Sequence, residues 1–214
     1  MQPKLIISIN TAWNIANFRA GLIGALQHAG YEVVAVAPPD EAVGRIEALG
    51  CRFVPLAMDN KGTNPWRDLM LYRRFRRILA QERPAAYLGY TIKPNVYGTL
   101  AARSLGIPTI NNVSGLGTAF IRTSWLTKVV ERLYRAALYH SNLVLFQNGD
   151  DQALFLDRNL VHPDRTDLVP GSGIDLAAFA PQPSPPRPAQ SPLVMLLIAR
   201  LLYGGARSRK VLDH

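Results

Sequence analysis

Polar side chains that could bind a ligand gather in three short segments of the chain. These segments are residues 10–14, 91–95 and 111–117, and each follows an apolar run. A loop surface rich in amide, hydroxyl and ammonium groups is costly to maintain unless a ligand binds there. The candidate ligand-binding residues are Asn10, Trp13, Asn14, Thr91, Lys93, Asn95, Asn111, Asn112, Ser114, Gly115 and Gly117.

Lys93 indicates what kind of ligand this would be. It directly precedes Pro94, a residue favoured in the first turn of a helix, so its ammonium is predicted at a helix N-terminus. Positive charge there opposes the helix dipole. A bound phosphate or diphosphate would resolve the conflict, whereas a solvated lysine is the structural alternative.

Ordinary structural roles remain open for several of these residues. Asn14 could cap a helix with Trp13 packed against it, and turn chemistry alone accounts for Gly115 and Gly117. Turn chemistry explains two adjacent asparagines after a strand less well. We therefore keep ligand contact and local capping as competing interpretations.

Strand-like and helix-like runs alternate along the chain and must position these segments. Strands are predicted at residues 4–9, 31–37, 51–56, 85–90, 107–111, 141–147 and 166–170, and helices at 15–30, 40–50, 66–82, 94–105, 125–140 and 150–159. This alternation predicts an α/β fold, a Rossmann-like parallel sheet with helices on both faces. Ligands of such sheets bind at the carboxyl ends of the strands, where the polar segments fall.

The C-terminal part of the chain differs in composition. Residues 1–179 form the predicted Rossmann-like domain, 180–192 a proline-rich linker, and 193–214 the truncated start of a second domain. The apolar run 193–202 is a strand built for burial, so we expect self-association through it.

The net charge of +9 calls for an anionic partner. Two predicted helices carry exposed cations, for which a solvated face is the usual explanation. Neighbouring tryptophans make an anionic membrane surface an equal candidate. The candidate membrane-facing residues are Arg73, Arg74, Arg77, Lys128 and Arg132. Since no nucleic-acid-binding signature occurs, we expect no nucleic-acid partner.

Other classes of site lack support in the sequence. The four histidines show no metal-ligand spacing, and no GxSxG elbow or Ser-His-Asp order occurs. The single cysteine, Cys51, begins an apolar run and is predicted to be a buried thiol. We therefore predict neither a metal nor a cofactor.

Six motifs occur in an order that resembles a known family. They are NTAWNIANFR, KGTNP, YTIKPNVYG, INNVSGLGTAFI, FQNGDDQALF and LVPGSGIDLAAF. Over residues 4–202 the chain resembles the N-terminal domain of family 4 glycosyltransferases. The branch it resembles acts on undecaprenyl-diphosphate-linked sugars in bacterial surface polysaccharide synthesis.

The resemblance implies a GT-B fold, in which two Rossmann-like domains face each other across a cleft. It implies retaining transfer of a sugar from a nucleotide sugar to a lipid-linked or polysaccharide acceptor, without a required metal. The location implied is cytoplasmic, peripheral on the inner face of the plasma membrane. The three polar segments would line the acceptor side, and Gly171, Gly173, Asp175 and Arg200 would lie near the donor diphosphate.

The chain departs from the family pattern near its end. The lysine that follows the arginine in relatives is Gly205 here, and the family's paired glutamates would lie beyond His214. No general base is assigned, because the family histidine is absent from the 111–117 segment. We expect no transfer by this chain alone; the alternative is a non-enzymatic module that binds the acceptor or a membrane.

Overall fold

The computed structural model describes residues 2–59, 64–115, 125–176 and 179–180. Contacts divide the chain into two units, Met1–Leu176 and Ala177–His214, and the description below concerns the first. Predictions for Gly117, Arg200, residues 181–192 of the linker and the 193–202 strand lie outside the described residues.

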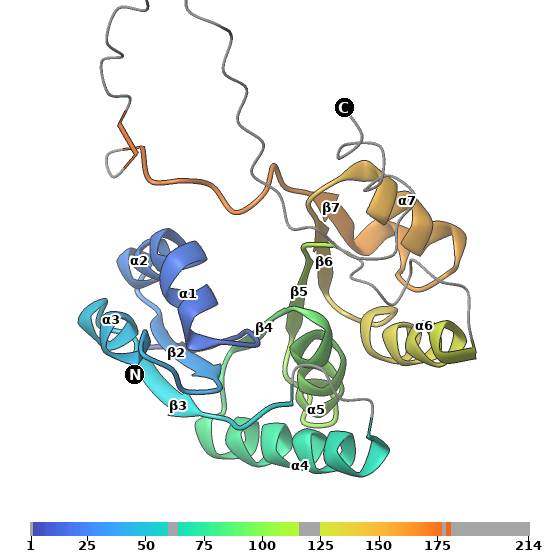
Figure 1. The fold of residues 1–214 in the computed structure, drawn as a ribbon, viewed down its shortest axis with the longest axis horizontal. Helices are drawn as coiled ribbons and strands as arrows, with labels where there is room; N and C mark the ends of the chain where they lie inside the picture. The colour runs from blue at the N-terminus through green and yellow to red at the C-terminus, as the bar shows by residue number, and fades with distance from the viewer. Residues whose placement is uncertain (1, 60–63, 116–124, 177–178, 181–214) are drawn as a thin grey trace, which may run out of the picture. The chain divides into compact units, whose positions relative to one another are not determined.

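Within the described residues a seven-stranded, all-parallel sheet forms the centre of the first unit (Figure 1). The strand order is β3-β2-β1-β4-β5-β6-β7. The strands are β1 (Lys4–Ser8), β2 (Glu32–Ala37), β3 (Arg52–Pro55), β4 (Ala86–Tyr90), β5 (Thr109–Val113), β6 (Leu143–Phe146) and β7 (Thr166–Leu168). The predicted α/β, Rossmann-like sheet is confirmed.

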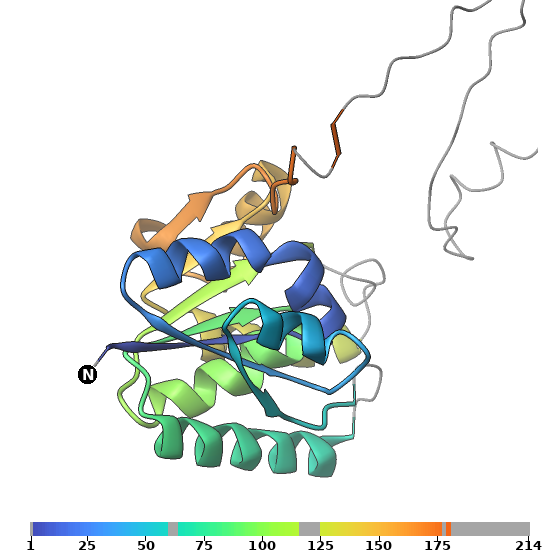
Figure 2. The same ribbon diagram turned by 90° about the vertical axis from the view of Figure 1, so that its left-hand side faces the viewer.

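Helices cover both faces of the sheet, as predicted (Figure 2). Helices α1 (Ala12–Phe18), α2 (Ala20–His28) and α3 (Val43–Ala48) pack on one face. Helices α4 (Pro65–Glu82), α5 (Thr99–Arg103), α6 (Trp125–Leu138) and α7 (Gly149–Asp157) pack on the other. Two short segments complete the description: the π-helix η1 (Pro94–Gly98) and the 3-10 helix η3 (Pro163–Arg165).

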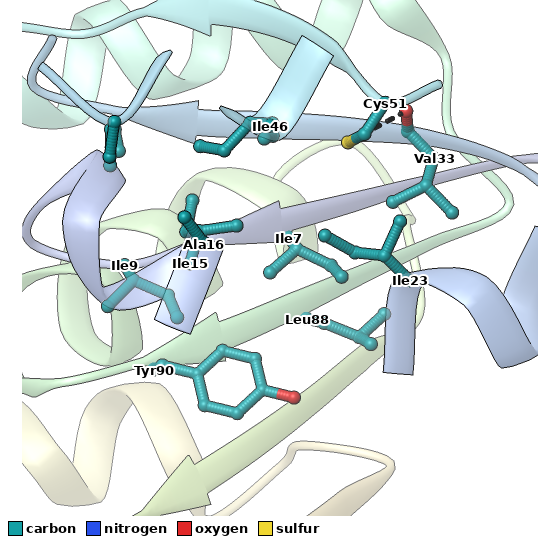
Figure 3. Packing of buried hydrophobic residues seen from close by; sticks show 14 of the residues in the cluster. Ile7, Ile9, Ile15, Ala16, Ile23, Val33, Ile46, Cys51, Leu88 and Tyr90 are labelled. Atoms are coloured by element: carbon teal, nitrogen blue, oxygen red, sulfur yellow. Dashed lines mark hydrogen bonds between the residues drawn. The ribbon is translucent and has the colours of Figure 1, made fainter. Parts of the chain in front are cut away.

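The core is built by alternation along the strands. Successive side chains of a strand point to opposite faces, so Ile6 packs under α4 while Ile7 packs under α1 and α2. Figure 3 shows the hydrophobic cluster around Ile7, in which Ile15 and Ile23 lie against β1 and β4. Cys51 is buried there, its thiol donates to the Val33 carbonyl, and burial raises its pKa to about 11.

Two predicted helices differ in detail from the observed ones. The helix predicted at 15–30 is interrupted at Arg19, whose backbone angles (φ −125°, ψ 3°) separate α1 from α2. The helix predicted at 94–105 begins with the wider π-turn of η1. The Tyr87 hydroxyl enters this turn and donates to the Pro94 carbonyl at 3.0 Å. Gly98 leaves room for it, since a Cβ there would lie 1.9 Å from the Tyr87 oxygen.

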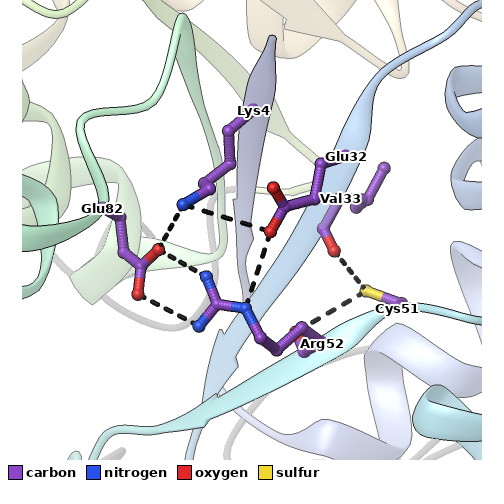
Figure 4. Close-up of polar contacts among 6 residues, drawn as sticks. All are labelled: Lys4, Glu32, Val33, Cys51, Arg52 and Glu82. Carbon is purple, nitrogen blue, oxygen red and sulfur yellow. Dashed lines mark hydrogen bonds and ion pairs between the residues drawn. The ribbon is translucent and has the colours of Figure 1, made fainter. Parts of the chain in front are cut away.

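Four charged side chains tie the amino ends of the strands to α4 (Figure 4). Lys4 Nζ lies 2.8 Å from Glu82 Oε2 at the end of α4, and Arg52 binds both carboxylate oxygens of Glu82. Arg52 Nε also lies 3.6 Å from Glu32. This network stands at the amino ends of β1, β2 and β3, opposite the carboxyl edge where the predicted site lies.

Candidate functional site

The carboxyl edge of the sheet collects the predicted polar segments. Strands β1, β4, β5 and β6 are successive hydrogen-bonded neighbours and run parallel. Their carboxyl ends therefore lie side by side, and each leads into one polar segment, beginning near Asn10, Thr91, Ser114 and Gln147. The predicted co-location of these segments is confirmed at the level of the fold.

After β1, the cap of α1 is Thr11 rather than Asn14. Thr11 Oγ1 accepts from the Asn14 backbone N–H at 3.1 Å, while the Asn14 amide donates to Asn10 Oδ1 at 2.8 Å. The capping role considered for Asn14 is therefore wrong. The Trp13 indole is 45% exposed and packs edge-on against Phe18, with ring centroids 5.8 Å apart. This exposed aromatic pair presents an apolar surface beside the polar segment.

The partner of Lys93 is part of the chain itself. Its ammonium lies 2.7 Å from Asp68 Oδ1, and the Tyr97 hydroxyl donates to Asp68 Oδ2 at 2.8 Å. Both charged side chains are only 13% exposed. The negative charge expected beside Lys93 is thus supplied by Asp68 in the first turn of α4, and no ligand anion is needed to explain it. Burial, together with the bond to Asp68, raises the pKa of Tyr97.

A pocket of about 390 Å³ opens beside this ion pair. Its wall includes the exposed Trp66 and the methionines Met58 and Met70, together with the cations Arg67 and Arg74. Arg67 lies 3.1 Å from Asp59, and Arg74 donates to the Ala57 carbonyl at 3.2 Å. Apolar and cationic groups side by side suit a ligand that carries both an anion and an apolar part.

Three of the predicted acceptor residues are buried. Asn95, Asn111 and Asn112 are 1%, 0% and 7% exposed. The Asn111 amide donates to Asn95 Oδ1 at 2.9 Å and to Thr99 Oγ1 at 2.7 Å, and its oxygen accepts from Ser141. The Asn95 amide donates to the Asn112 carbonyl at 2.9 Å. The Asn95 and Asn111 amides are both satisfied inside the protein, so we replace their predicted ligand contact with a role in joining η1, β5 and the start of β6.

Asn112, Ser114 and Gly115 lie at the carboxyl end of β5. Asn112 Oδ1 accepts from Gln147 Nε2 at 3.3 Å, and the same nitrogen lies 3.5 Å from Ser172 Oγ. Ser114 and Gly115 are exposed directly after β5. Asn112, Gln147 and Ser172 therefore form a polar line across the ends of β5 and β6. In the sequence, Gln147 was noted only as part of the motif FQNGDDQALF.

The predicted donor-side segment meets this line. Gly171 and Gly173 have φ of +90° and +75°, which side chains rarely tolerate, so both glycines are required by the turn. Ser172 between them contacts Gln147, and Asp175 is exposed. The turn thus lies at the carboxyl end of β6.

Arg19 and Tyr90 form a contact that sequence reasoning missed. The Arg19 guanidinium lies 4.2 Å from the centroid of the Tyr90 ring, at the carboxyl end of β4. The next residue, Thr91, has φ of +60°, an uncommon conformation for a β-branched side chain. The available sequence signal was the arginine that ends NTAWNIANFR.

The predicted membrane-facing cations are all exposed. Arg73, Arg74 and Arg77 lie on α4, and Lys128 and Arg132 lie on α6. Among the described residues none of these five has a carboxylate within ion-pair distance. On α6, Glu131 forms an ion pair with Arg158 at the end of α7.

The described part of the chain contains neither a metal-ligand cluster nor a membrane-spanning helix. No group of three or more histidine, cysteine or carboxylate side chains there could hold a metal ion. No helix there is long and apolar enough to cross a membrane.

Comparison with known proteins gives one family and a common fold. The model of a glycosyl transferase 4-like domain matches residues 15–172. No curated protein sequence matches the chain.

Three solved structures illustrate the structural likeness. Anabaena HepE in complex with UDP and glucose gives a TM-score of 0.61 at 13% identity, covering 85% of this chain and 47% of HepE. The UDP-GlcNAc 2-epimerase of Neisseria meningitidis bound to UDP-GlcNAc gives 0.57 at 13%, covering 77% and 46%. MurG of Acinetobacter baumannii gives 0.51 at 18%, covering 82% and 47%. The chain spans about half the length of these proteins, and at such identities the likeness shows the fold alone.

Proposed function

Since the chain belongs to the glycosyl transferase 4-like domain family, we propose that it supplies the acceptor-binding half of a glycosyltransferase. The reaction is retaining transfer of a sugar from a nucleotide sugar to a lipid-linked or polysaccharide acceptor, without a metal. The observation that carries the proposal is the family match over residues 15–172, which spans the polar segments along one edge of the sheet.

The geometry of this edge supports sugar binding. The exposed Trp13 ring offers an apolar face, and the line of Asn112, Gln147 and Ser172 offers amide and hydroxyl groups. Sugar sites combine these two kinds of surface, since a sugar ring has both C–H faces and hydroxyl groups. We assign the acceptor to this edge, and we assign the donor diphosphate to Gly171, Gly173 and Asp175.

A nucleotide sugar as donor is supported by the fold neighbours. The HepE structure holds UDP and glucose, and the Neisseria epimerase holds UDP-GlcNAc. In each case this chain covers less than half of the neighbour.

The exposed cations support a membrane-bound acceptor. Two arginines of α4, Arg67 and Arg74, line the pocket together with Trp66, Met58 and Met70, and Arg73 and Arg77 are exposed on the same helix. A basic helix face next to an exposed indole suits an anionic lipid surface. We propose peripheral attachment to the inner face of the plasma membrane, with Lys128 and Arg132 of α6 contributing.

A binding assay with the full chain tests the acceptor assignment. A polyprenyl-diphosphate-linked sugar in neutral nanodiscs is titrated against the wild type and against Trp13→Ala. We expect saturable binding that weakens at least about fivefold in the variant, because one buried aromatic contact contributes on the order of 1 kcal/mol. Leu49→Ala, an exposed apolar side chain after α3, is the matched control and is expected to bind as the wild type. Equal affinities for Trp13→Ala and wild type would contradict the assignment.

The same preparation tests whether the chain transfers sugar by itself. A panel of nucleotide sugars is added, and products are read by mass spectrometry, with the anomeric configuration read by NMR. A retained-configuration product would show a transferase that acts alone, against our expectation, whereas acceptor binding without product from any donor agrees with an acceptor-binding half and with a non-enzymatic module. An inverted product would overturn the retaining mechanism.

The membrane assignment has its own test. Flotation with anionic and zwitterionic liposomes compares Arg73→Gln/Arg77→Gln with Arg45→Gln/Arg165→Gln, two doubles of equal net charge. We expect the α4 double to lose roughly thirtyfold in anionic-liposome binding, since each of the two basic residues near such a surface contributes about 1 kcal/mol. Equal losses in both doubles would show that net charge alone attracts the protein.

A further inference from the structure

Arg19 is a half-buried cation without a counter-charge. It stands between α1 and α2, and its guanidinium covers the ring of Tyr90, the last residue of β4. Among the described residues no carboxylate lies within ion-pair distance of it. The other arginines that the structure describes without such a partner are exposed, apart from Arg103, which donates to the Ala136 carbonyl. Burial lowers the pKa of Arg19.

The hydrogen bonds of Arg19 are also incomplete. A guanidinium carries five N–H donors. Within the described residues only Nη1 has an acceptor, the Phe18 carbonyl at 3.3 Å, and Nε is buried with none. A buried donor without an acceptor is unfavourable, and the aromatic ring beneath offsets only part of this.

The neighbourhood holds the guanidinium in one place. The Tyr90 ring is 8% exposed and packs with Ile9 and Ile15, so it forms a fixed platform (Figure 3). The Arg19 backbone closes α1 through Ile15 and starts α2 through Ile23, which fixes the base of the side chain. A planar cation held on an aromatic ring is pre-organised to bind a planar or tetrahedral oxyanion.

From these observations we propose that Arg19, seated on Tyr90, binds an oxyanion of the ligand at the carboxyl ends of β1 and β4. The group is a phosphate or a carboxylate, which share the charge and the paired oxygens that a guanidinium recognises. This deepens the proposed acceptor site and rests on it for the identity of the natural ligand. The oxyanion contact is measured here without any donor, so it can fail while the transferase proposal stands.

The test uses the side-chain Nε–H signals of the full chain, labelled with ¹⁵N. Sodium pyrophosphate and sodium glucuronate are titrated separately at constant ionic strength. We expect the Arg19 Nε–H signal to shift saturably. Tighter binding of pyrophosphate would identify a phosphate as the natural group, and tighter binding of glucuronate would identify a carboxylate. The burial of this nitrogen protects the N–H from exchange and keeps its signal observable.

Three variants make the outcome decisive. Arg19→Gln is expected to lose about tenfold or more in affinity, and Tyr90→Leu to lose severalfold because the platform is removed. Arg45→Gln, an exposed arginine on the next helix of the same face, is expected to bind as the wild type. Unchanged affinity in a folded Arg19→Gln, or an Arg19 signal that moves with neither salt, would overturn the proposal. If Arg19→Gln does not fold, the wild-type signal and Tyr90→Leu still decide it.

Discussion

Lys93 and Asp68 form an ion pair of 2.7 Å between the start of η1 and the first turn of α4. The two charges have opposite effects on the helices that carry them. Asp68 is favourable at the N-terminus of its own helix, whereas Lys93 is unfavourable at the start of η1. The carboxylate therefore compensates the lysine and also accepts the Tyr97 hydroxyl, which fastens the two helices together at the rim of the pocket.

Removing the carboxylate of this pair should destabilise the fold. In Asp68→Asn the Lys93 ammonium stays 13% exposed without its counter-charge. We expect a loss of about 2–4 kcal/mol in the free energy of unfolding, measured by urea denaturation. Asp59→Asn is the matched control, because its pair with Arg67 is exposed and is expected to contribute less than about 1 kcal/mol. Equal losses in the two variants would contradict a buried role for the Lys93 pair.

The buried amide of Asn111 predicts a second large effect. Asn111→Ala leaves Asn95 Oδ1, the Thr99 hydroxyl and the Ser141 hydroxyl without this partner. We expect a loss of about 2–4 kcal/mol, because buried polar groups would remain unpaired. Ser114→Ala, at an exposed position after the same strand, should change stability by less than about 0.5 kcal/mol. A ligand-only role for Asn111 would instead leave the stability of the free protein unchanged.

The sequence predicted the strands and the edge where polar segments meet, because continuous apolar runs and the alternation of strands with helices are local patterns. It failed where a residue's partner is distant in the chain. Lys93 pairs with Asp68 across 25 residues, and Asn111 bonds Ser141 across 30. The residue types that mark a ligand site also suit buried networks, so only the fold separates Asn111 from Asn112. Arg19 was missed because its aromatic platform comes from β4.

The glycine in η1 provides a third prediction. A Cβ on Gly98 would lie 1.9 Å from the Tyr87 hydroxyl oxygen and 2.4 Å from the ring carbon that bears it. Gly98→Ala is therefore expected to lower the unfolding free energy by about 1–3 kcal/mol through overpacking. In α2, Gly24→Ala meets no atom within 4 Å and should stabilise by up to about 1 kcal/mol through helix propensity. Thermal unfolding of both variants should thus show opposite shifts; a stabilised Gly98→Ala would mean that η1 can widen freely.

The ion network at the amino ends of the strands should make stability depend on pH. Hydrogen bonding to Arg52, reinforced by Lys4, lowers the pKa of Glu82 from 4.5 to about 2. A carboxyl group whose pKa is depressed by folding stabilises the protein fully above its unfolded pKa. That contribution is lost as the pH falls from about 5 towards 2.

Comparison of Glu82→Gln with the wild type isolates this effect. The wild type should be more stable by about 1–2 kcal/mol at neutral pH, a figure kept low because the Arg52 side chain is 46% exposed. The difference should shrink as the pH falls from about 5 to 2 and vanish below the folded pKa of about 2, as followed by urea unfolding at each pH. Glu41→Gln, at an exposed position without an ion pair among the described residues, serves as the control. A difference that stays constant down to pH 2 would show that Glu82 acts through packing, since removal of its charge would then cost nothing.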